Sequence, residues 1–229
     1  MSEKGKENNN NPLKKVSIFS KLNETELDYI LNSMTIKTYP ANEVIFYEGD
    51  VPDGLYLVKR GRVKISLIDE RSREITLSIL REGSFFGEMA LFDESPRSAT
   101  VQTMEETEFF ILTKSYFLQL IEQSSTIAKN ILKEMSTRLR EADDQIRNLA
   151  LFDVAGRLAN ILINLVKKEG VVLKNKDMAV VPRPSQQELA NMIGSSRETV
   201  SRVLNTFKKK GIISISRKQI IIHHIGKLL

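Results

Sequence analysis

The chain has 229 residues and a formal net charge of +5, with 41% hydrophobic residues, 28% charged residues and no cysteine. This composition indicates a folded chain of one or two domains, and it excludes disulfides, thiolate catalysis, cysteine-bound zinc and iron–sulfur clusters. The two histidines, His223 and His224, are adjacent near the C-terminus, so we expect neither a histidine-based metal site nor a Ser–His triad.

The charge is distributed unevenly along the chain. Residues 1–149 contain 20 basic and 24 acidic residues, whereas residues 150–229 contain 14 basic and 5 acidic ones. This excess of positive charge suggests that the C-terminal part binds a polyanion, with chance surface composition as the alternative. No apolar run approaches the ~20 residues of a membrane span, and the polar N-terminus lacks a signal-peptide core. We therefore expect a cytoplasmic protein without a membrane partner.

The first half of the chain predicts a disordered tail, a helix and then many strands. Residues 1–12 include the low-complexity run MSEKGKENNNN, which is typical of disorder. Asn23 followed by Glu26 predicts a capped helix start. From 36 to 112, the short β-prone runs VIFYEGD, GLYLVKRG, RVKISLIDE and REITLSIL alternate with glycine-bearing turns. Such a pattern is typical of a sandwich, barrel or roll.

A long helix is predicted next. Apolar residues recur at alternating spacings of four and three from 125 to 149, which is a heptad seam. Its members are Ala128, Leu132, Met135, Leu139, Ala142, Ile146 and Leu149. The seam favours a two-stranded coiled coil between two copies of the chain, and an intramolecular packing face is the alternative. A further helix is expected over 154–167, followed by a loop or hairpin over 168–176.

The segment PRPSQQELANMIGSSRETVSRVLNTFKKKG predicts a helix-turn-helix. Ser185 with Glu188, and Ser195 with Glu198, each form a capping-box pattern that marks a helix start. Gly194 lies between the two helices, where a left-handed residue is needed. After Gly211, the runs IISIS and QIIIHH predict a β-wing.

The second helix of this motif has two different faces. Its inward face is expected to consist of Val200, Val203, Leu204 and Phe207. Polar residues near its N-terminal end suit base edges of DNA, because Arg pairs with guanine and Glu accepts from cytosine. The expected DNA-contacting residues are Gln186, Ser196, Arg197, Glu198, Thr199, Ser201 and Arg202. A surface Glu198–Arg202 pair is the alternative. Lys208–Lys210, Arg217 and Lys218 either bind phosphate or are simply solvated.

The segment GSFFGEMALFDESPRSATV carries a second candidate site. Gly87 permits a tight backbone turn, and a short helix can begin directly after it. Glu88 suits acceptance of hydroxyl groups, Arg97 is a fork-shaped phosphate ligand, and Ser98 adds a hydroxyl. From the residues alone, a buried Glu88–Arg97 ion pair is an equally good interpretation.

These motifs resemble the CRP/FNR superfamily of transcription regulators, most closely its cyclic-AMP receptor branch, over nearly the whole chain from about Ile18. The similarity includes SSRETVSRVL, the segment NLALFDVAGR, and GEMALF with PRSATV, which resembles the phosphate cassette of cyclic-nucleotide-binding domains. The resemblance implies an effector site in which Glu88 holds the ribose 2′-hydroxyl and Arg97 and Ser98 hold the cyclic phosphate. The other implied members are Leu77, Ser78, Gly87, Met89, Ala90, Arg138, Ala142 and Asp143.

One departure leaves the base open. Where the family branch carries a Thr-Ser pair that reaches adenine, this chain has Ala142 and Asp143. Asp143 can accept from an adenine or a guanine amine, so cyclic AMP is favoured and cyclic GMP remains open. The absence of cysteine and of internal histidine removes iron–sulfur and haem sensors, and no metal is expected.

The resulting prediction is an α+β chain with a jelly-roll-like β-roll that binds a cyclic nucleotide, a long dimerisation helix and a winged helix-turn-helix. The expected boundaries are 13–124, 125–152 and 153–229, after the tail at 1–12. The dimer contacts are assigned to Leu132, Met135, Leu139, Ala142, Ile146 and Leu149. The expected function is a homodimeric, nucleotide-responsive regulator that binds pseudo-palindromic double-stranded DNA and RNA polymerase. A constitutive regulator, or one that senses another effector, is the alternative; an enzyme is not expected.

Overall fold

The computed structural model describes residues 11–173, 177–223 and 225–228. Nearly all of the predicted disordered tail, the last three residues of the predicted 168–176 loop and His224 lie outside these residues. Contacts between Cα atoms divide the chain into two units, residues 1–66 with 79–139, and residues 67–78 with 140–229.

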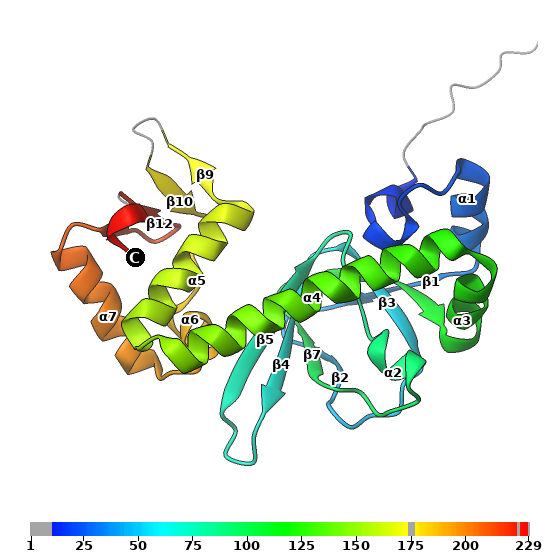
Figure 1. Cartoon of the computed structure of the whole chain (residues 1–229), viewed down its shortest axis with the longest axis horizontal. Helices are drawn as coiled ribbons and strands as arrows, with labels where there is room; N and C mark the ends of the chain where they lie inside the picture. The colour runs from blue at the N-terminus through cyan, green and yellow to red at the C-terminus, as the bar shows by residue number, and fades with distance from the viewer. Residues whose placement is uncertain (1–10, 174–176, 224, 229) are drawn as a thin grey trace, which may run out of the picture. The chain divides into compact units, whose positions relative to one another are not determined.

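The structure has the α+β composition that the sequence predicts (Figure 1). The α-helices are α1 (Glu24–Asn32), α2 (Met89–Phe92), α3 (Lys114–Gln123), α4 (Ser125–Leu151), α5 (Val154–Glu169), α6 (Gln186–Ile193) and α7 (Arg197–Lys209). Short 3-10 helices occupy Pro12–Lys15, Ser17–Phe19 and Ile225–Lys227. The strands are β1 (Thr35–Tyr39), β2 (Val44–Phe46), β3 (Gly54–Arg60), β4 (Arg62–Ile68), β5 (Glu74–Arg81), β6 (Phe85–Phe86), β7 (Thr100–Thr103), β8 (Thr107–Thr113), β9 (Val171–Val172), β10 (Met178–Val180), β11 (Ile213–Ile215) and β12 (Ile220–Ile222).

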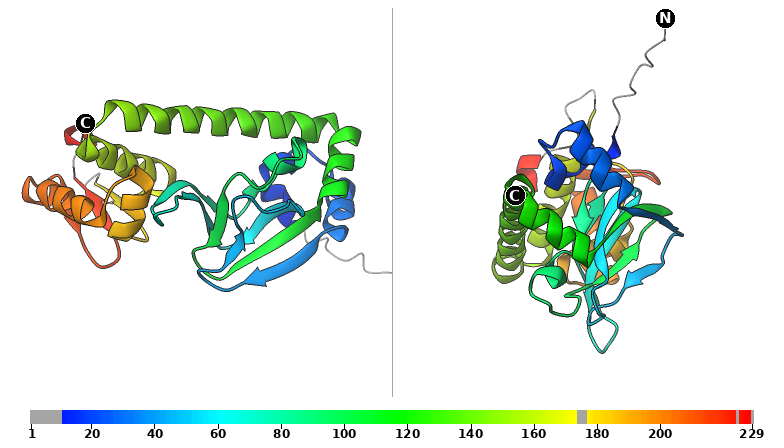
Figure 2. Two further views of the ribbon diagram at one scale, coloured as in Figure 1. Left: turned by 90° about the horizontal axis from the view of Figure 1, so that it is seen from below. Right: turned by 90° about the vertical axis from the view of Figure 1, so that its right-hand side faces the viewer.

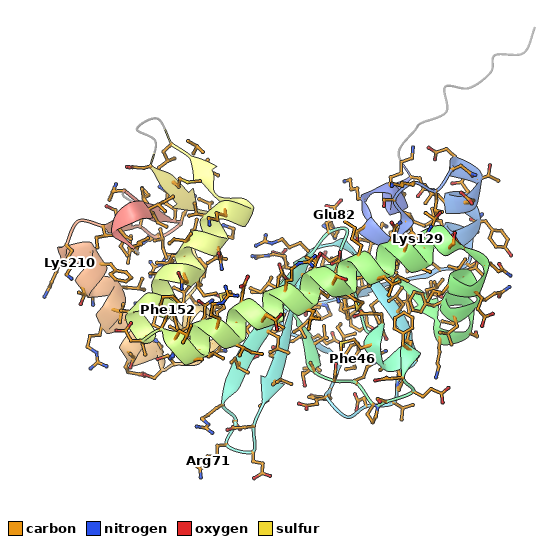
Figure 3. The ribbon with its side chains drawn as sticks, viewed as in Figure 1. Phe46, Arg71, Glu82, Lys129, Phe152 and Lys210 are labelled. Atoms are coloured by element: carbon orange, nitrogen blue, oxygen red, sulfur yellow. The ribbon has the colours of Figure 1, made fainter. Side chains whose placement is uncertain are left out.

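The strands of the N-terminal half form the predicted roll from two four-stranded sheets, with orders β1-β8-β3-β6 and β2-β7-β4-β5. Strand β3 is buried on both faces, which explains its apolar run. Leu55 and Leu57 pack into the cluster that α1, α3 and the start of α4 form, whereas Tyr56 and Val58 pack toward the second sheet. Alternate side chains of a strand point to opposite faces, so one strand joins the two cores. Arg71 lies at the tip of the β4–β5 hairpin (Figure 3).

In the C-terminal half, helices α5, α6 and α7 pack together over a four-stranded sheet of order β11-β12-β10-β9. The three helices lie side by side in the yellow-green to orange part of the chain (Figure 2). Val200 and Leu204 of α7 are buried, and Val203 and Phe207 pack against the same cluster. The predicted inward face of the second motif helix is therefore confirmed, as is the β-wing from β11 and β12.

The helix-turn-helix differs from the prediction at one cap. Ser185 and Glu188 form the predicted capping box of α6, and Gly194 is left-handed at φ 59°. The predicted Ser195 cap is wrong: Ser196 caps α7, accepting from the Thr199 N–H. The Ser195 N–H instead donates to Ala190 O at 3.0 Å, so Ser195 completes the C-terminal cap of α6 and the next helix begins one residue later.

Helix α4 carries an exposed apolar stripe. Leu132, Leu139 and Ile146, spaced by seven residues, are 67%, 65% and 63% exposed. The buried residues of the helix are instead Ile127 and Ile131, and Met135 packs against the core of α1 and α3. Part of the seam thus serves the fold of one chain, and the remainder is exposed in the isolated chain.

Candidate ligand pocket and nucleic-acid interface

Arg97 is the centre of the first candidate site. The residue is buried, with an exposure of 2%. Nη1 donates to Gly87 O at 2.7 Å, and Nη2 donates to Asp53 Oδ1 at 2.7 Å and to Gly54 O at 2.9 Å. Its Cζ also lies 4.1 Å from the centroid of the Phe46 ring, which is labelled in Figure 3. A buried cation is therefore fixed by charge, by carbonyl dipoles and by an aromatic face.

Glu88 is the second buried charge of this segment. The Arg138 Nη1 donates to its Oε1 at 3.0 Å, and Arg138 is itself held by Phe85 O at 2.6 Å. Burial raises the pKa of the Glu88 carboxyl, and the Arg138 charge opposes that effect. Glu88 thus pairs with Arg138 while Arg97 pairs with Asp53, so the alternative of a Glu88–Arg97 ion pair is wrong.

Each of these two side chains retains one buried atom without a hydrogen-bond partner among the described residues. The two atoms are Glu88 Oε2, an acceptor, and Arg97 Nε, a donor. Buried polar atoms are nearly always paired, and an unpaired one costs about 1–3 kcal/mol. One orphan acceptor and one orphan donor in the same ten-residue segment are what a hydroxyl-bearing anion would satisfy.

Gly87 allows the segment to close around Arg97. Its φ is 84°, and a Cβ built there would lie 2.5 Å from Arg97 Nη1. Only glycine therefore permits both this backbone conformation and this approach. The predicted short helix follows as α2, from Met89, with Ala90 buried and Met89 exposed. Ser98 is exposed, and its Oγ lies 3.9 Å from the Met89 sulfur.

The remaining predicted ligand residues lie on β5 and α4. Leu77 and Ser78 are half-buried on β5, and Leu77 O accepts from Gln145 Nε2 at 2.6 Å. Ala142 and Asp143 are exposed on α4. The roles of these four residues in base recognition stay predictions.

Sequence reasoning missed Asp53 and Phe46, which hold Arg97. Asp53 lies 44 positions from Arg97 along the chain, and no local spacing connects them. The available signal was only that a buried arginine requires an anion. Tyr56 also belongs here, because its hydroxyl donates to Asp53 Oδ2 at 2.8 Å. Burial and this hydrogen bond raise the pKa of the Tyr56 phenol.

The second candidate site is the outer face of α7. Arg197, Glu198 and Arg202 are exposed, and Thr199 Oγ1 accepts from Arg202 Nη2 at 3.2 Å. Arg202 therefore binds Thr199 rather than Glu198, so the alternative of a Glu198–Arg202 pair is wrong. A shallow open hollow on this face is lined by Glu198, Ser201, Arg202, Asn205, Thr206 and Lys209. Asn205 and Thr206 were not predicted, although their spacing from Ser201 and Arg202 places them on the same helical face.

The other predicted DNA residues surround this face. Gln186 is the first residue of α6, and Ser196 is the N-cap of α7. Lys210, labelled in Figure 3, extends away from the C-terminal end of α7. Arg217 and Lys218 are exposed between β11 and β12. The N-terminus of α7 thus presents side chains that can donate to and accept from base edges.

Comparison with known proteins identifies both halves. A cyclic nucleotide-binding domain matches residues 36–124, and a Crp-like helix-turn-helix domain matches residues 156–229. The cAMP-activated global transcriptional regulator CRP of Salmonella typhimurium is 32% identical over 198 residues, covering 86% of this chain and 93% of the relative. The chain belongs to the CRP/FNR family of transcription regulators. Its relatives in that family are transcription regulators rather than enzymes, and its Crp-like helix-turn-helix domain makes the chain a DNA-binding transcription regulator.

Other CRP/FNR members support the same assignment. The Cyclic AMP receptor protein of Thermus thermophilus is 34% identical, covering 86% of this chain and 88% of the relative. The c-di-GMP responsive regulator CLP of Xanthomonas campestris is 26% identical and superposes with a TM-score of 0.77, covering 88% of this chain and 100% of that one. Within the described ranges, no helix has the length and apolar character to cross a membrane. The same residues contain no group of three or more His, Cys, Asp or Glu side chains that could hold a metal ion.

Proposed function

We propose that this CRP/FNR member is a homodimeric, sequence-specific DNA-binding regulator controlled by a cyclic nucleotide. The observation that carries the proposal is the pair of buried orphan atoms, Glu88 Oε2 and Arg97 Nε. In a vestigial pocket, two buried charges would raise the free-energy cost of folding without serving ligand binding. The constitutive alternative lacks this support.

The residues present fit a cyclic nucleotide. Glu88 would accept from the ribose 2′-hydroxyl, and Arg97, with Ser98 and the backbone of Gly87, would hold the cyclic phosphate. A bound phosphate competes with Asp53 for Arg97, because both are anions and Asp53 is the exposed partner, with 67% of its side chain accessible. When the effector binds, its phosphate would replace Asp53 as the anionic partner of Arg97, so the cation would not be left unpaired.

Cyclic AMP is the favoured effector. Relatives 32–34% identical to the chain carry names that include cyclic AMP, whereas CLP, at 26% identity, is described as responsive to c-di-GMP. We assign Asp143 as the acceptor of a hydrogen bond from a base amine. We place Arg138, Leu77 and Ser78 near the base. Cyclic GMP also carries an amine that could donate a hydrogen bond to Asp143, so it belongs in the same titration.

Dimerisation through the exposed stripe on α4 would place two recognition helices on one DNA duplex. The proposed contacts are the exposed Leu132, Leu139 and Ile146, with Ala142, Leu149 and the partly buried Met135 beside them. A two-fold dimer reads a pseudo-palindromic site with half-sites one helical turn apart. RNA polymerase is the expected protein partner. The cytoplasm is the expected compartment.

The test is calorimetric titration with cyclic AMP, cyclic GMP and c-di-GMP, followed by operator binding with and without the ligand. Arg97→Gln should lose most of the nucleotide affinity, because a neutral amide cannot replace the charged fork. Ser98→Ala should lose less, because Ser98 is exposed and supplies one neutral hydroxyl. Wild-type protein that binds none of the three ligands, or operator binding that ignores a bound one, would contradict nucleotide control.

A further inference from the structure

The sheet of the C-terminal half aligns an acid, an imidazole and a hydroxyl on one face. Met178 of β10 pairs with Ile222 of β12, so Asp177 lies opposite His223, one step beyond that pair. Ser214 of β11 pairs with Ile221 of β12. Ile221 is two residues before His223 on the same chain segment, so the two side chains share a face. Because side chains alternate between faces, Asp177, His223 and Ser214 all project from the same face.

These three side chains are in hydrogen-bond contact. The His223 Nδ1 lies 2.8 Å from Asp177 Oδ2, and its Nε2 lies 2.6 Å from Ser214 Oγ. A carboxylate only accepts, so Nδ1 carries a proton toward Asp177. In the neutral ring, Nε2 then accepts, and the Ser214 hydroxyl is the donor. This order of groups is that of an activated serine, in which the acid orients the base and the base takes the hydroxyl proton.

The arrangement meets two further requirements of a reactive serine. Ser214 is exposed, while only 14% of the Asp177 side chain and 30% of the His223 side chain are accessible. The His223 N–H donates to Ile212 O, which makes Ser214–Ile221 the next hydrogen-bonded pair of the ladder. The N–H of Ile215 therefore points away from β12, to the open edge of the sheet, where β11 is the last strand. A backbone N–H directly after the nucleophile is a common donor to a developing oxyanion.

We propose that Ser214 is a nucleophilic modification site that is acylated by activated carboxylic esters. The Ser214 Oγ attacks the ester carbonyl carbon as its proton moves to His223 Nε2. The bond to the leaving group then breaks, the leaving alcohol or phenol takes that proton, and Ser214 carries the acyl ester. The step is stoichiometric, so the protein remains a regulator with a covalently modified wing. The sequence analysis expects no Ser–His triad at the adjacent histidines; Asp177, the acid of this arrangement, is 46 positions from His223.

The matched control for this proposal lies in the same wing. Ser216 is also exposed, but its Oγ lies 3.4 Å from the backbone oxygen of Gln219, which accepts from it. Among the residues that the structure describes, it contacts no imidazole. A structural chain of hydrogen bonds that merely ties three strands together would leave Ser214 and Ser216 equally unreactive.

The experiment treats the full chain with p-nitrophenyl acetate and measures the acetylation rate of each serine by peptide mass spectrometry. A positioned general base contributes about 10²–10⁴-fold, so Ser214 should be acetylated at least about 100-fold faster than Ser216. His223→Gln should reduce the Ser214 rate to that of Ser216, Asp177→Asn should reduce it at least about tenfold, and Ser216→Ala should leave it unchanged.

Two results would overturn the proposal. One is a Ser214 rate in wild-type protein no greater than that of Ser216, a comparison within one folded protein that requires no variant. The other is a fast Ser214 rate that persists in His223→Gln. Neither result bears on nucleotide control, which depends on other residues.

Discussion

Replacing Leu139 with glutamate should convert the proposed dimer into monomers. Burying a leucine or isoleucine fully is worth about 1.5–3 kcal/mol. With 65% of Leu139 exposed in the single chain, dimerisation has about 1–2 kcal/mol left to gain at this residue, or about 2–4 kcal/mol from both copies. Its loss corresponds to about 30- to 700-fold in the dissociation constant of the dimer. The desolvation of two facing carboxylates adds to the effect.

Sedimentation velocity over a concentration series measures this change. The control is Thr137→Glu, which adds the same charge to α4 at an exposed position two residues away, off the seam. Because Leu139 is mostly exposed, the variant should keep the fold of the single chain, which circular dichroism checks. A Leu139→Glu protein that remains as tight a dimer as Thr137→Glu would show that the stripe is not the dimer interface.

Three other predictions concern the pocket and the recognition helix. Glu88→Gln should weaken nucleotide binding, yet gain stability relative to wild type as pH rises above about 4.3. The reason is that burial raises the pKa of Glu88, so wild-type protein loses the stability that the protonated acid provides as pH rises through the raised pKa. Urea unfolding at several pH values measures the difference in the free energy of unfolding between the two proteins. A difference that does not change with pH would contradict the prediction. Arg202→Ala should lose about 1–3 kcal/mol of DNA-binding free energy per half-site and relax base preference locally, whereas Lys209→Ala should weaken binding to all sequences and lower the slope of log K against log salt concentration by about one. Selection from randomised DNA combined with salt titration distinguishes the two effects. Unchanged base preference in Arg202→Ala would remove that residue as a base reader. Asp143→Ala should change the ratio of cyclic AMP to cyclic GMP affinity, and equal losses for both ligands in calorimetry would remove Asp143 as the reader of the base.

Local chemistry made much of the fold predictable. The capping box at Ser185, the left-handed Gly194 and the inward face of α7 each depend on residues within one or two helical turns, and the structure contains all three. The second cap failed because Ser195 and Ser196 are adjacent and both are good N-caps. The choice between them depends on which N–H closes the preceding helix, and that choice is made by three-dimensional geometry.

The pocket was predictable only in part. The segment from Gly87 to Ser98 identified the buried acid and the buried cation, because unusual charges in an apolar setting call for a partner. The partners themselves come from elsewhere: Asp53 from the end of the β2–β3 loop and Arg138 from α4. Pairings at such separations in the chain depend on sheet register and helix docking, which no local pattern specifies.

The fixed position of Arg97 determines whether folding or ligand binding bears the entropic cost of ordering its side chain. A free arginine side chain has about 2 kcal/mol of rotamer entropy to lose on becoming ordered. Here Gly87 O, Gly54 O and the Phe46 ring already hold the guanidinium, so folding rather than binding bears that entropic cost. An incoming anion would meet a preorganised cation. In the proposed regulator, its binding free energy would therefore remain available to shift a conformational equilibrium that governs contact with DNA.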